Sequence, residues 1–254
     1  MTNLIISGIF GHMGRTVLEL AQADKEFCVL AGVDMKNGET AGVPVYDGFD
    51  KISAAADAVV DFSAAANLYN VLSYCERTGA AAILCATGYS EEDLKTIERA
   101  SGKIPLFKTA NLSVGVNLLQ KLVKEAAAFL GENFDVEIIE KHHNLKKDAP
   151  SGTAYMLAES VNEAFDGNKK YVYGREGMTG ARDRRELGIH AVRGGTIVGE
   201  HEVMFAGEDE IITLSHSARS KRVFAAGALK AASFMKGKPA GRYDMKNVID
   251  GMKK

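Results

Sequence analysis

The residues best suited to chemistry lie in one short stretch, Glu140–Ala154, which reads EKHHNLKKDAPSGTA. It holds two adjacent histidines, His142 and His143, and imidazoles can exchange protons near neutral pH. Three lysines in the same stretch add positive charge. Taken singly, each of these residues is most simply a member of a solvated basic loop. The combination indicates a site that binds a carboxylate and moves a proton.

The segments on either side of this stretch predict how it is positioned. Residues 134–140, FDVEIIE, partly alternate polar with apolar, which is typical of a strand. Residues 155–165, YMLAESVNEAF, have apolar positions at helical spacing. Ser151 is suited to be the N-cap of this helix, and a helix start offers backbone N–H groups to an anion. We therefore expect a strand-to-helix loop.

Composition limits the classes of protein that the chain can belong to. A length of 254 residues fits one large domain or two small ones. A net charge of −2 without a basic stripe disfavours nucleic acid as a partner, and no apolar run is long enough for a membrane span. The start of the chain lacks a basic segment, so no secretory signal is expected. The cysteines, Cys28, Cys75 and Cys85, form no CxxC pair, which favours a reduced, cytoplasmic protein.

The first 34 residues follow the pattern of a dinucleotide-binding fold. A short apolar strand, residues 3–8, leads into Gly8, Gly11 and Gly14, then into a helical segment. The next strand ends at Asp34, whose carboxylate could accept hydrogen bonds from both ribose hydroxyls. A glycine triplet alone is about as often a structural turn as a cofactor site. Its place between strand and helix, with Asp34 at a suitable distance, favours a nucleotide.

Strands and helices continue to alternate up to about residue 113. Strand signals fall at 54–63, 80–90 and 104–113, with helices at 67–79 and 90–101. Ser90 is the expected N-cap of the second of these helices. Parallel strands exit at one edge of a sheet, where ligands bind. The exits expected at this edge are Gly8, Asp34, Ser63, Ala86 and Ala110-Asn111.

A different pattern follows and indicates a second domain. A helix at 113–131 leads into it. Three segments, 187–195, 196–207 and 209–218, read as strands separated by glycine-containing turns, and we expect an antiparallel meander. A helix at 222–237 and the tail are expected to return to the first domain. The predicted division is 1–112 plus about 225–254 for the dinucleotide domain, and 113–224 for the substrate and oligomerisation domain.

Two further features leave alternatives open. The loop Gly174–Glu186 could be a lid over an acidic substrate or an ordinary solvated loop. Its arginines are Arg175, Arg182, Arg184 and Arg185. Histidines on three of the expected strands could converge on a metal, but none has the spacing of a zinc motif, so no metal is expected. These histidines are His190, His201 and His216.

These motifs together resemble the bacterial 4-hydroxy-tetrahydrodipicolinate reductase family, also called dihydrodipicolinate reductase. GIFGHMGR is similar to the family's nucleotide loop, CATGY to its second cofactor loop and TANLSVGVN to its hinge. EKHHNLKKDAPSGTA is similar to its most specific signature. HAVRGGTIVGEHEVMFAG and SHSARSKRVFAAGALKAA extend the resemblance to residue 232.

The resemblance implies a role for each matched residue. His142 would donate and accept the proton, and Lys146 would be a second donor. The dicarboxylate substrate would be bound by His143, Lys146 and the helix start at Ser151, Gly152 and Thr153. The implied cofactor contacts are Gly8, Ile9, Phe10, Gly11, His12, Met13, Asp34, Cys85, Ala86, Thr87, Thr109, Ala110, Asn111 and Leu112. The family's α/β fold pairs a Rossmann-like domain with a second α+β domain, whose mixed or antiparallel sheet builds a homotetramer.

The implied activity is NADH- or NADPH-dependent reduction of 4-hydroxy-tetrahydrodipicolinate with loss of water, in lysine and diaminopimelate biosynthesis. Two departures bear on the cofactor. Many relatives place an arginine after the acidic residue, where this chain has Asp34-Met35, so we expect use of NADH or of both cofactors. The alternative is that Lys36, His12 or Arg15 takes the place of that arginine. At Ala86 a side-chain hydroxyl is lost. The rival interpretations are another two-domain nicotinamide oxidoreductase, a metal-dependent hydrolase and a non-enzymatic nucleotide sensor.

Overall fold

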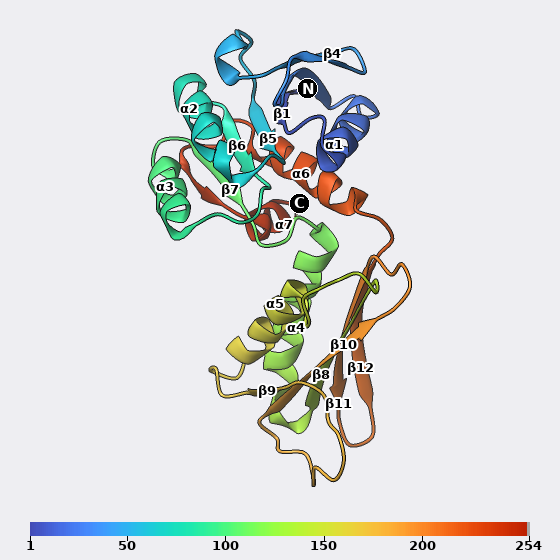
Figure 1. Ribbon diagram of the computed structural model, residues 1–254. Coiled ribbons are helices and arrows are strands. Elements are labelled where there is room, and N and C mark those ends of the chain that lie inside the picture. Colours follow the sequence, from blue (N-terminus) through green and yellow to red (C-terminus); the bar gives the residue numbers. More distant parts are fainter. Residues whose placement is uncertain (253–254) are drawn as a thin grey trace. The chain divides into compact units, whose positions relative to one another are not determined.

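A computed structural model describes residues 1–252 and divides into two compact units (Figure 1). Unit 1 consists of Met1–Val114 together with the segment that begins at Lys221, and unit 2 is Gly115–Ser220. Each unit has its own sheet and its own apolar core. None of the helices in residues 1–252 combines the length and the apolar character needed to cross a membrane.

Unit 1 is built on an eight-stranded sheet in the order β13-β7-β6-β5-β1-β2-β4-β3. Its strands are β1 Thr2–Ser7, β2 Phe27–Val33, β3 Gly38–Thr40, β4 Val43–Tyr46, β5 Ala58–Asp61, β6 Ala81–Leu84, β7 Pro105–Lys108 and β13 Gly241–Tyr243. Its helices are α1 His12–Gln22, α2 Leu68–Thr78, α3 Glu91–Ser101, α6 Arg222–Met235 and α7 Met245–Gly251. Every strand pair is parallel except β3 with β4. This confirms the Rossmann-like α/β prediction.

Helices cover both faces of this sheet, and successive residues of a strand point to opposite faces. In β1, Leu4 and Ile6 pack into a core shared with α1, α6 and α7, whereas Ile5 packs into the core shared with α2 and α3. Ser90 caps α3 as predicted, with a reciprocal bond to Asp93. Near the end of the chain, β13 pairs with β7 in parallel.

The sequence analysis missed three strands of unit 1, which are β3, β4 and the terminal β13. β3 and β4 form a short antiparallel ribbon whose second strand pairs with β2 at the sheet edge. They are three and four residues long, and β4 contains Pro44. Such short segments carry too little alternation to be recognised. Proline also argues against a strand, because it is tolerated only at the edge of a sheet.

Unit 2 contains a five-stranded mixed sheet in the order β12-β11-β8-β10-β9. The strands are β8 Asp135–His142, β9 Lys170–Val172, β10 Glu186–Arg193, β11 Gly199–Ala206 and β12 Ile211–Ala218, and the helices are α4 Val114–Leu130 and α5 Gly152–Glu163. Side chains from both helices pack on one face of the sheet, against Val136, Ile138, Val203 and Phe205. The mixed sheet of the predicted second domain is confirmed.

The predicted meander is wrong at its first strand. β10 pairs with β8 in parallel, and β11 pairs with β8 in antiparallel, so β8 lies between β10 and β11. The chain leaves β8 through α5, forms the edge strand β9 and then returns as β10, which lies between β9 and β8 and is parallel to both. The turn signals were read correctly as turns. They could not show that a third strand separates the two segments they connect.

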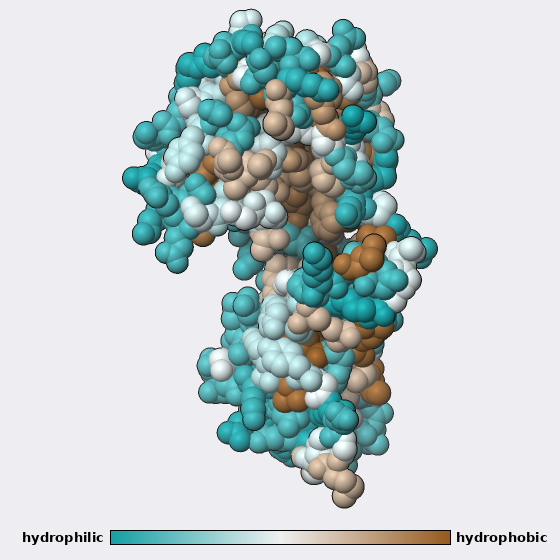
Figure 2. Space-filling model, in the orientation of Figure 1, coloured by the Kyte–Doolittle hydropathy of each residue, from teal (hydrophilic) through white to brown (hydrophobic). Residues whose placement is uncertain are grey.

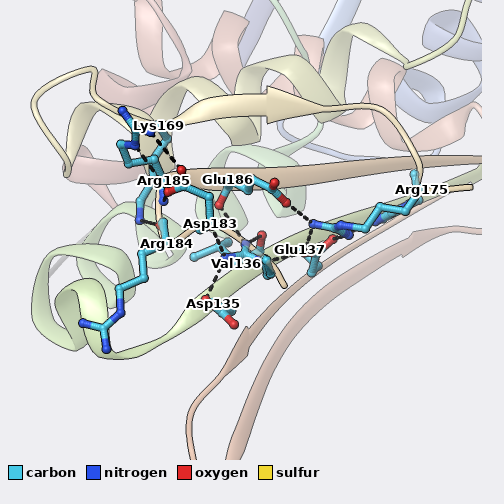
Figure 3. A network of polar contacts seen from close by, with 11 residues as sticks. Asp135, Val136, Glu137, Lys169, Arg175, Asp183, Arg184, Arg185 and Glu186 are labelled. Atoms are coloured by element: carbon cyan, nitrogen blue, oxygen red, sulfur yellow. Dashed lines mark hydrogen bonds and ion pairs between the residues drawn. The ribbon is translucent and has the colours of Figure 1, made fainter. Parts of the chain in front are cut away.

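The loop Gly174–Glu186 is held down by ion pairs (Figure 3). Arg175 and Arg182 both donate to Glu137, and Arg182 also donates to Asp135. Burial alone would raise the pKa of Glu137, but the two guanidiniums and His190 lower it to about 2. Arg185 pairs with Asp183. These three arginines are thus bound to the protein's own carboxylates, which supports a structural role for them.

The sheet face of unit 2 that faces away from α4 and α5 carries apolar side chains. Pairing register places Ile139, Val192, Met204 and Ile211 on this face. Val192 is 44% exposed and Ile211 is 63% exposed. Apolar atoms, brown in Figure 2, reach the surface of this unit beside hydrophilic ones. We call these four residues the open-face strip.

Candidate functional site

The Glu140–Ala154 stretch forms the end of β8, a loop and the start of α5, as predicted from the flanking patterns. Because side chains alternate along a strand, Glu140 and His142 lie on the same face of β8 as the core residues Val136 and Ile138. Both are buried: Glu140 is 0% exposed and His142 is 9% exposed. The buried face of β8 is therefore apolar in its first half and polar at its end.

A short hydrogen bond orients the imidazole of His142. Its Nδ1 lies 2.6 Å from Oε2 of Glu140. Burial would raise the pKa of Glu140, but Arg193, His142 and the Ser151 N–H hold it below the ordinary value. The carboxylate is therefore ionised and can only accept, so Nδ1 of His142 carries the hydrogen. This leaves Nε2 as the nitrogen that can exchange a proton with a ligand.

Ser151 caps α5, and its own N–H donates to Oε1 of Glu140 at 2.9 Å. Its hydroxyl accepts from the N–H of Ala154 and lies 2.9 Å from Nε2 of His201. Side chain and N–H are therefore both used within the protein. Of the residues predicted to bind the carboxylate, Gly152 and Thr153 are the first two of the helix, where the helix dipole favours an anion.

His201, from β11, is buried beside this cluster. Its ring lies 5.2 Å from that of His142, with the planes at 73°. Burial and the neighbouring His142 lower the pKa of His201 to about 4. The imidazole of His201 is therefore neutral at neutral pH and adds no positive charge to the buried space.

The two other predicted site residues of the loop are less enclosed. Lys146 forms an ion pair with Asp148 at 2.9 Å, and its side chain is 21% exposed. That lysine lowers the pKa of Asp148. The Nδ1 of His143 is buried without a hydrogen-bond partner among residues 1–252. A buried polar nitrogen of this kind is suited to a ligand that supplies the missing partner.

Gly199, the first residue of β11, borders the nitrogen of His142 that is left for proton exchange. A methyl group added at this glycine would lie 3.1 Å from Nε2 and 3.4 Å from Cδ2 of His142. Both distances are short for a carbon atom, so any side chain here would crowd the reactive side of the imidazole.

In unit 1, the three glycines of the predicted nucleotide loop have distinct steric roles. Gly8 has a φ of 76°, a conformation that favours glycine. A methyl group at Gly14 would lie 2.1 Å from the carbonyl oxygen of Gly8, so the helix start can approach the turn only without a side chain. Gly11 is the N-cap of α1 and provides no side-chain cap. The N–H groups at this helix start are thus suited to a pyrophosphate.

Asp34 lies directly after β2, at the same sheet edge. Its Oδ2 accepts from the N–H of Phe10 at 2.8 Å, and its Oδ1 accepts from the N–H of Met35 at 2.8 Å. Both oxygens are held by backbone, yet each keeps a lone pair for another donor. The carboxylate is thereby oriented as the ribose of a dinucleotide requires.

A cavity of about 930 Å³ opens at this edge of unit 1 and is large enough for a dinucleotide. The glycine turn, the bare helix start and the oriented Asp34 all border it, so the residues present fit NADH or NADPH. Its lining includes Gly8, Gly11, Asp34, Met35, Phe62, Ser63 and Asn67. The predicted loops Cys85–Thr87 and Thr109–Leu112 follow β6 and β7, whose carboxyl ends lie at this edge as well.

The sequence analysis missed Glu140, Arg193, His201 and Gly199 as site residues. Glu140 could have been found, because it precedes His142 by two residues on one strand and must share its face. The other three could not, because they lie on β10 and β11, whose pairing with β8 is not visible in the sequence.

No metal centre is apparent among residues 1–252, where no group of three or more His, Cys, Asp or Glu side chains could hold an ion. Nε2 of His190 donates to Oε2 of Glu137 at 2.7 Å, away from His201 and Ser151. His201 and His216 are register partners on adjacent strands. His190 therefore lies apart from His201 and His216, which are neighbours on one face of the sheet.

Comparison with known proteins gives matches along almost the whole chain. Residues 2–112 match the family model for the N-terminus of dihydrodipicolinate reductase, and residues 115–249 match that for its C-terminus. The 4-hydroxy-tetrahydrodipicolinate reductase of Caldanaerobacter subterraneus subsp. tengcongensis is 51% identical over 98% of each chain. That of Clostridium tetani is 44% identical over 96% of each chain.

Among solved structures, a dipicolinate-bound dihydrodipicolinate reductase from Paenisporosarcina sp. TG-14 is similar in fold. The TM-score is 0.80 at 24% identity, over 96% of this chain and 97% of that one. The matched models and relatives confirm the resemblance drawn from the motifs. The chain therefore belongs to the dihydrodipicolinate reductase family, a family of oxidoreductases.

Proposed function

We propose that this protein reduces 4-hydroxy-tetrahydrodipicolinate to tetrahydrodipicolinate, with loss of water, in lysine and diaminopimelate biosynthesis. The observation that carries the proposal is the His142–Glu140 pair beside the start of α5, because it combines a proton donor with an anion site. The two curated relatives described above bear the name of this activity.

In this proposal, the chain's residues bind the substrate and supply its proton. Loss of the substrate's 4-hydroxyl as water leaves a conjugated ring, and NADH or NADPH, held by the glycine turn and Asp34, would supply the hydride that reduces it. Nε2 of protonated His142 then donates a proton to the electron-rich ring that results. Glu140 holds the imidazole in the tautomer that this transfer requires. Lys146 and the N–H groups at Gly152 and Thr153 offset the charge of the substrate carboxylates.

His142→Gln tests the proton donor directly. General acid catalysis is typically worth about 10²–10⁴-fold, so we expect kcat to fall about a hundredfold or more. Cofactor binding should change little, since the nucleotide loop is in unit 1. The measurement is the loss of NADH absorbance with freshly generated 4-hydroxy-tetrahydrodipicolinate. An unchanged kcat would remove His142 from this role.

Gly199→Ala tests whether the approach to Nε2 must stay open. We expect kcat to fall about tenfold, or ~1.4 kcal/mol in barrier, because the added methyl group crowds the imidazole. Gly194→Ala is the matched control, since a methyl group there meets nothing within 4 Å. Equal activity of the two variants would show that the approach is not restricted at this position.

The cofactor preference should follow from Asp34. A carboxylate there accepts ribose hydroxyls and repels a 2′-phosphate, and Met35 offers no positive charge. We expect kcat/KM with NADH to be at least equal to that with NADPH. Asp34→Asn should shift the ratio toward NADPH, whereas Asp24→Asn, at an exposed position outside the cavity, should not. A wild-type preference of a hundredfold for NADPH would contradict this assignment.

We also propose that the open-face strip of unit 2 packs against other copies of the chain in a homotetramer. Val192 and Ile211 are exposed apolar residues on a sheet face that also carries Lys141, Glu200 and Glu202. Exposed apolar residues rimmed by polar ones are typical of an interaction surface. In solution the protein should then have four times the 27.3 kDa mass of one chain. Ile211→Asp should lower this mass in light scattering, whereas Met178→Asp, on the exposed loop, should leave it unchanged. A wild-type protein of monomer mass would refute the tetramer.

A further inference from the structure

Arg193, at the end of β10, makes four hydrogen bonds through its two terminal nitrogens, although the sequence analysis assigned it no role. Its two terminal nitrogens donate to the two oxygens of Glu140, at 2.8 and 2.7 Å. One of them also donates to the carbonyl of Asp148 at 2.7 Å, and the other to that of Val192 at 2.8 Å. The side chain is 20% exposed. Such a two-point pairing fixes the orientation of the carboxylate as well as its charge.

Through Glu140, this pairing reaches both parts of the proposed site. Oε2 of Glu140 holds Nδ1 of His142, and Oε1 holds the N–H of Ser151, the N-cap of α5. One carboxylate therefore fixes the proton donor and the anion-binding helix start relative to each other. Rotation of that carboxylate would disturb both at once.

Through Asp148, the same guanidinium reaches the loop that carries Lys146. Its bond to the Asp148 carbonyl fixes the backbone of the residue whose side chain pairs with Lys146. The turn after β10 adds two backbone bonds, from Gly194 N–H to the carbonyl of His142 and from Asn144 N–H to that of Gly195. The end of β10 therefore supports the whole loop.

We propose that Arg193 is a positioning residue that sets the tautomer and the charge of His142 and holds the loop of Lys146. This inference rests on the proposed reductase function. Arg193 need not touch the substrate, since it acts through Glu140 and the Asp148 carbonyl.

The charge of Arg193 should also influence the pH dependence of turnover. With Arg193 neutralised, the carboxylate of Glu140 would lose its two-point partner, and the charge balance beside His142 would change. The pH profile of kcat in Arg193→Gln should therefore differ from that of wild type. Charged or titratable groups near this cluster include His201 on β11, His216 on β12, and His143, Lys146 and Asp148 in the loop, whereas Lys141 and Glu200 pair on the opposite face of the sheet.

The test compares Arg193→Gln, Arg193→Lys and Arg193→Ala with the control Arg185→Gln, an exposed arginine paired with Asp183 in the same unit. We expect Arg193→Gln to lower kcat about a hundredfold, to raise KM for the substrate and to leave KM for NADH unchanged. Arg193→Lys should recover only part of kcat, because lysine lacks the two-point geometry. Added guanidinium salt at low concentration should raise the kcat of Arg193→Ala severalfold. Arg185→Gln should resemble wild type.

A second readout needs no substrate. The ¹⁵N chemical shifts of the His142 ring, assigned with the His142→Gln variant, should show the Nδ1–H tautomer in wild type and a mixture in Arg193→Gln. If wild type shows no reductase activity but Arg193→Gln still changes the tautomer of His142, the reductase function is rejected and the positioning role is supported. An unchanged tautomer and pH profile in Arg193→Gln would overturn the inference. It would also be overturned if kcat fell only in proportion to the unfolded fraction of the protein, as measured by circular dichroism.

Discussion

A fully buried carboxylate, that of Glu140, is the constraint around which unit 2 organises its polar cluster. A charge without solvent contact is costly unless other groups compensate it. Here the compensation comes from Arg193, His142 and the N–H of Ser151, so both oxygens are saturated. Removing one partner of a buried ion pair typically costs about 3–5 kcal/mol, because the other charge is left uncompensated. The groups that compensate Glu140 are thereby held in place.

Strand β8 brings this cluster to the edge of the core. Its first half supplies Val136 and Ile138 to the apolar layer beneath α4 and α5, and the same face continues as Glu140 and His142. A strand has little freedom to rotate once alternate residues are buried, because a one-residue slip would reverse every side chain. The packing of the apolar half therefore fixes the direction in which the imidazole points. Stability and proposed chemistry depend on the same strand.

Local patterns were sufficient to predict much of this structure. The strand-to-helix loop, the Ser151 cap and the glycine turn before α1 all follow from residues close together in the sequence. The order of strands in unit 2 does not, since β8 separates β10 from β11 only after a crossover through α5. Arg193, His201 and Gly199 lie on those strands. Their contribution to the site and the error in the meander prediction have the same cause, which is that the sequence does not show that β8 lies between β10 and β11.

The two units also differ in how they are suited to negatively charged ligands. In unit 1 the nucleotide edge offers backbone: a bare helix start and glycines, with Asp34 as an oriented acceptor. In unit 2 the proposed site presents side chains to the ligand. The lysines and histidines after β8, together with Arg193 on β10, outnumber the carboxylates Glu140 and Asp148. Backbone dipoles suit a cofactor whose phosphates must be bound but not altered. Titratable side chains suit a substrate that must take up a proton, because only they can release one. The proposed division of binding and proton transfer thus follows from the kind of donor that each unit presents.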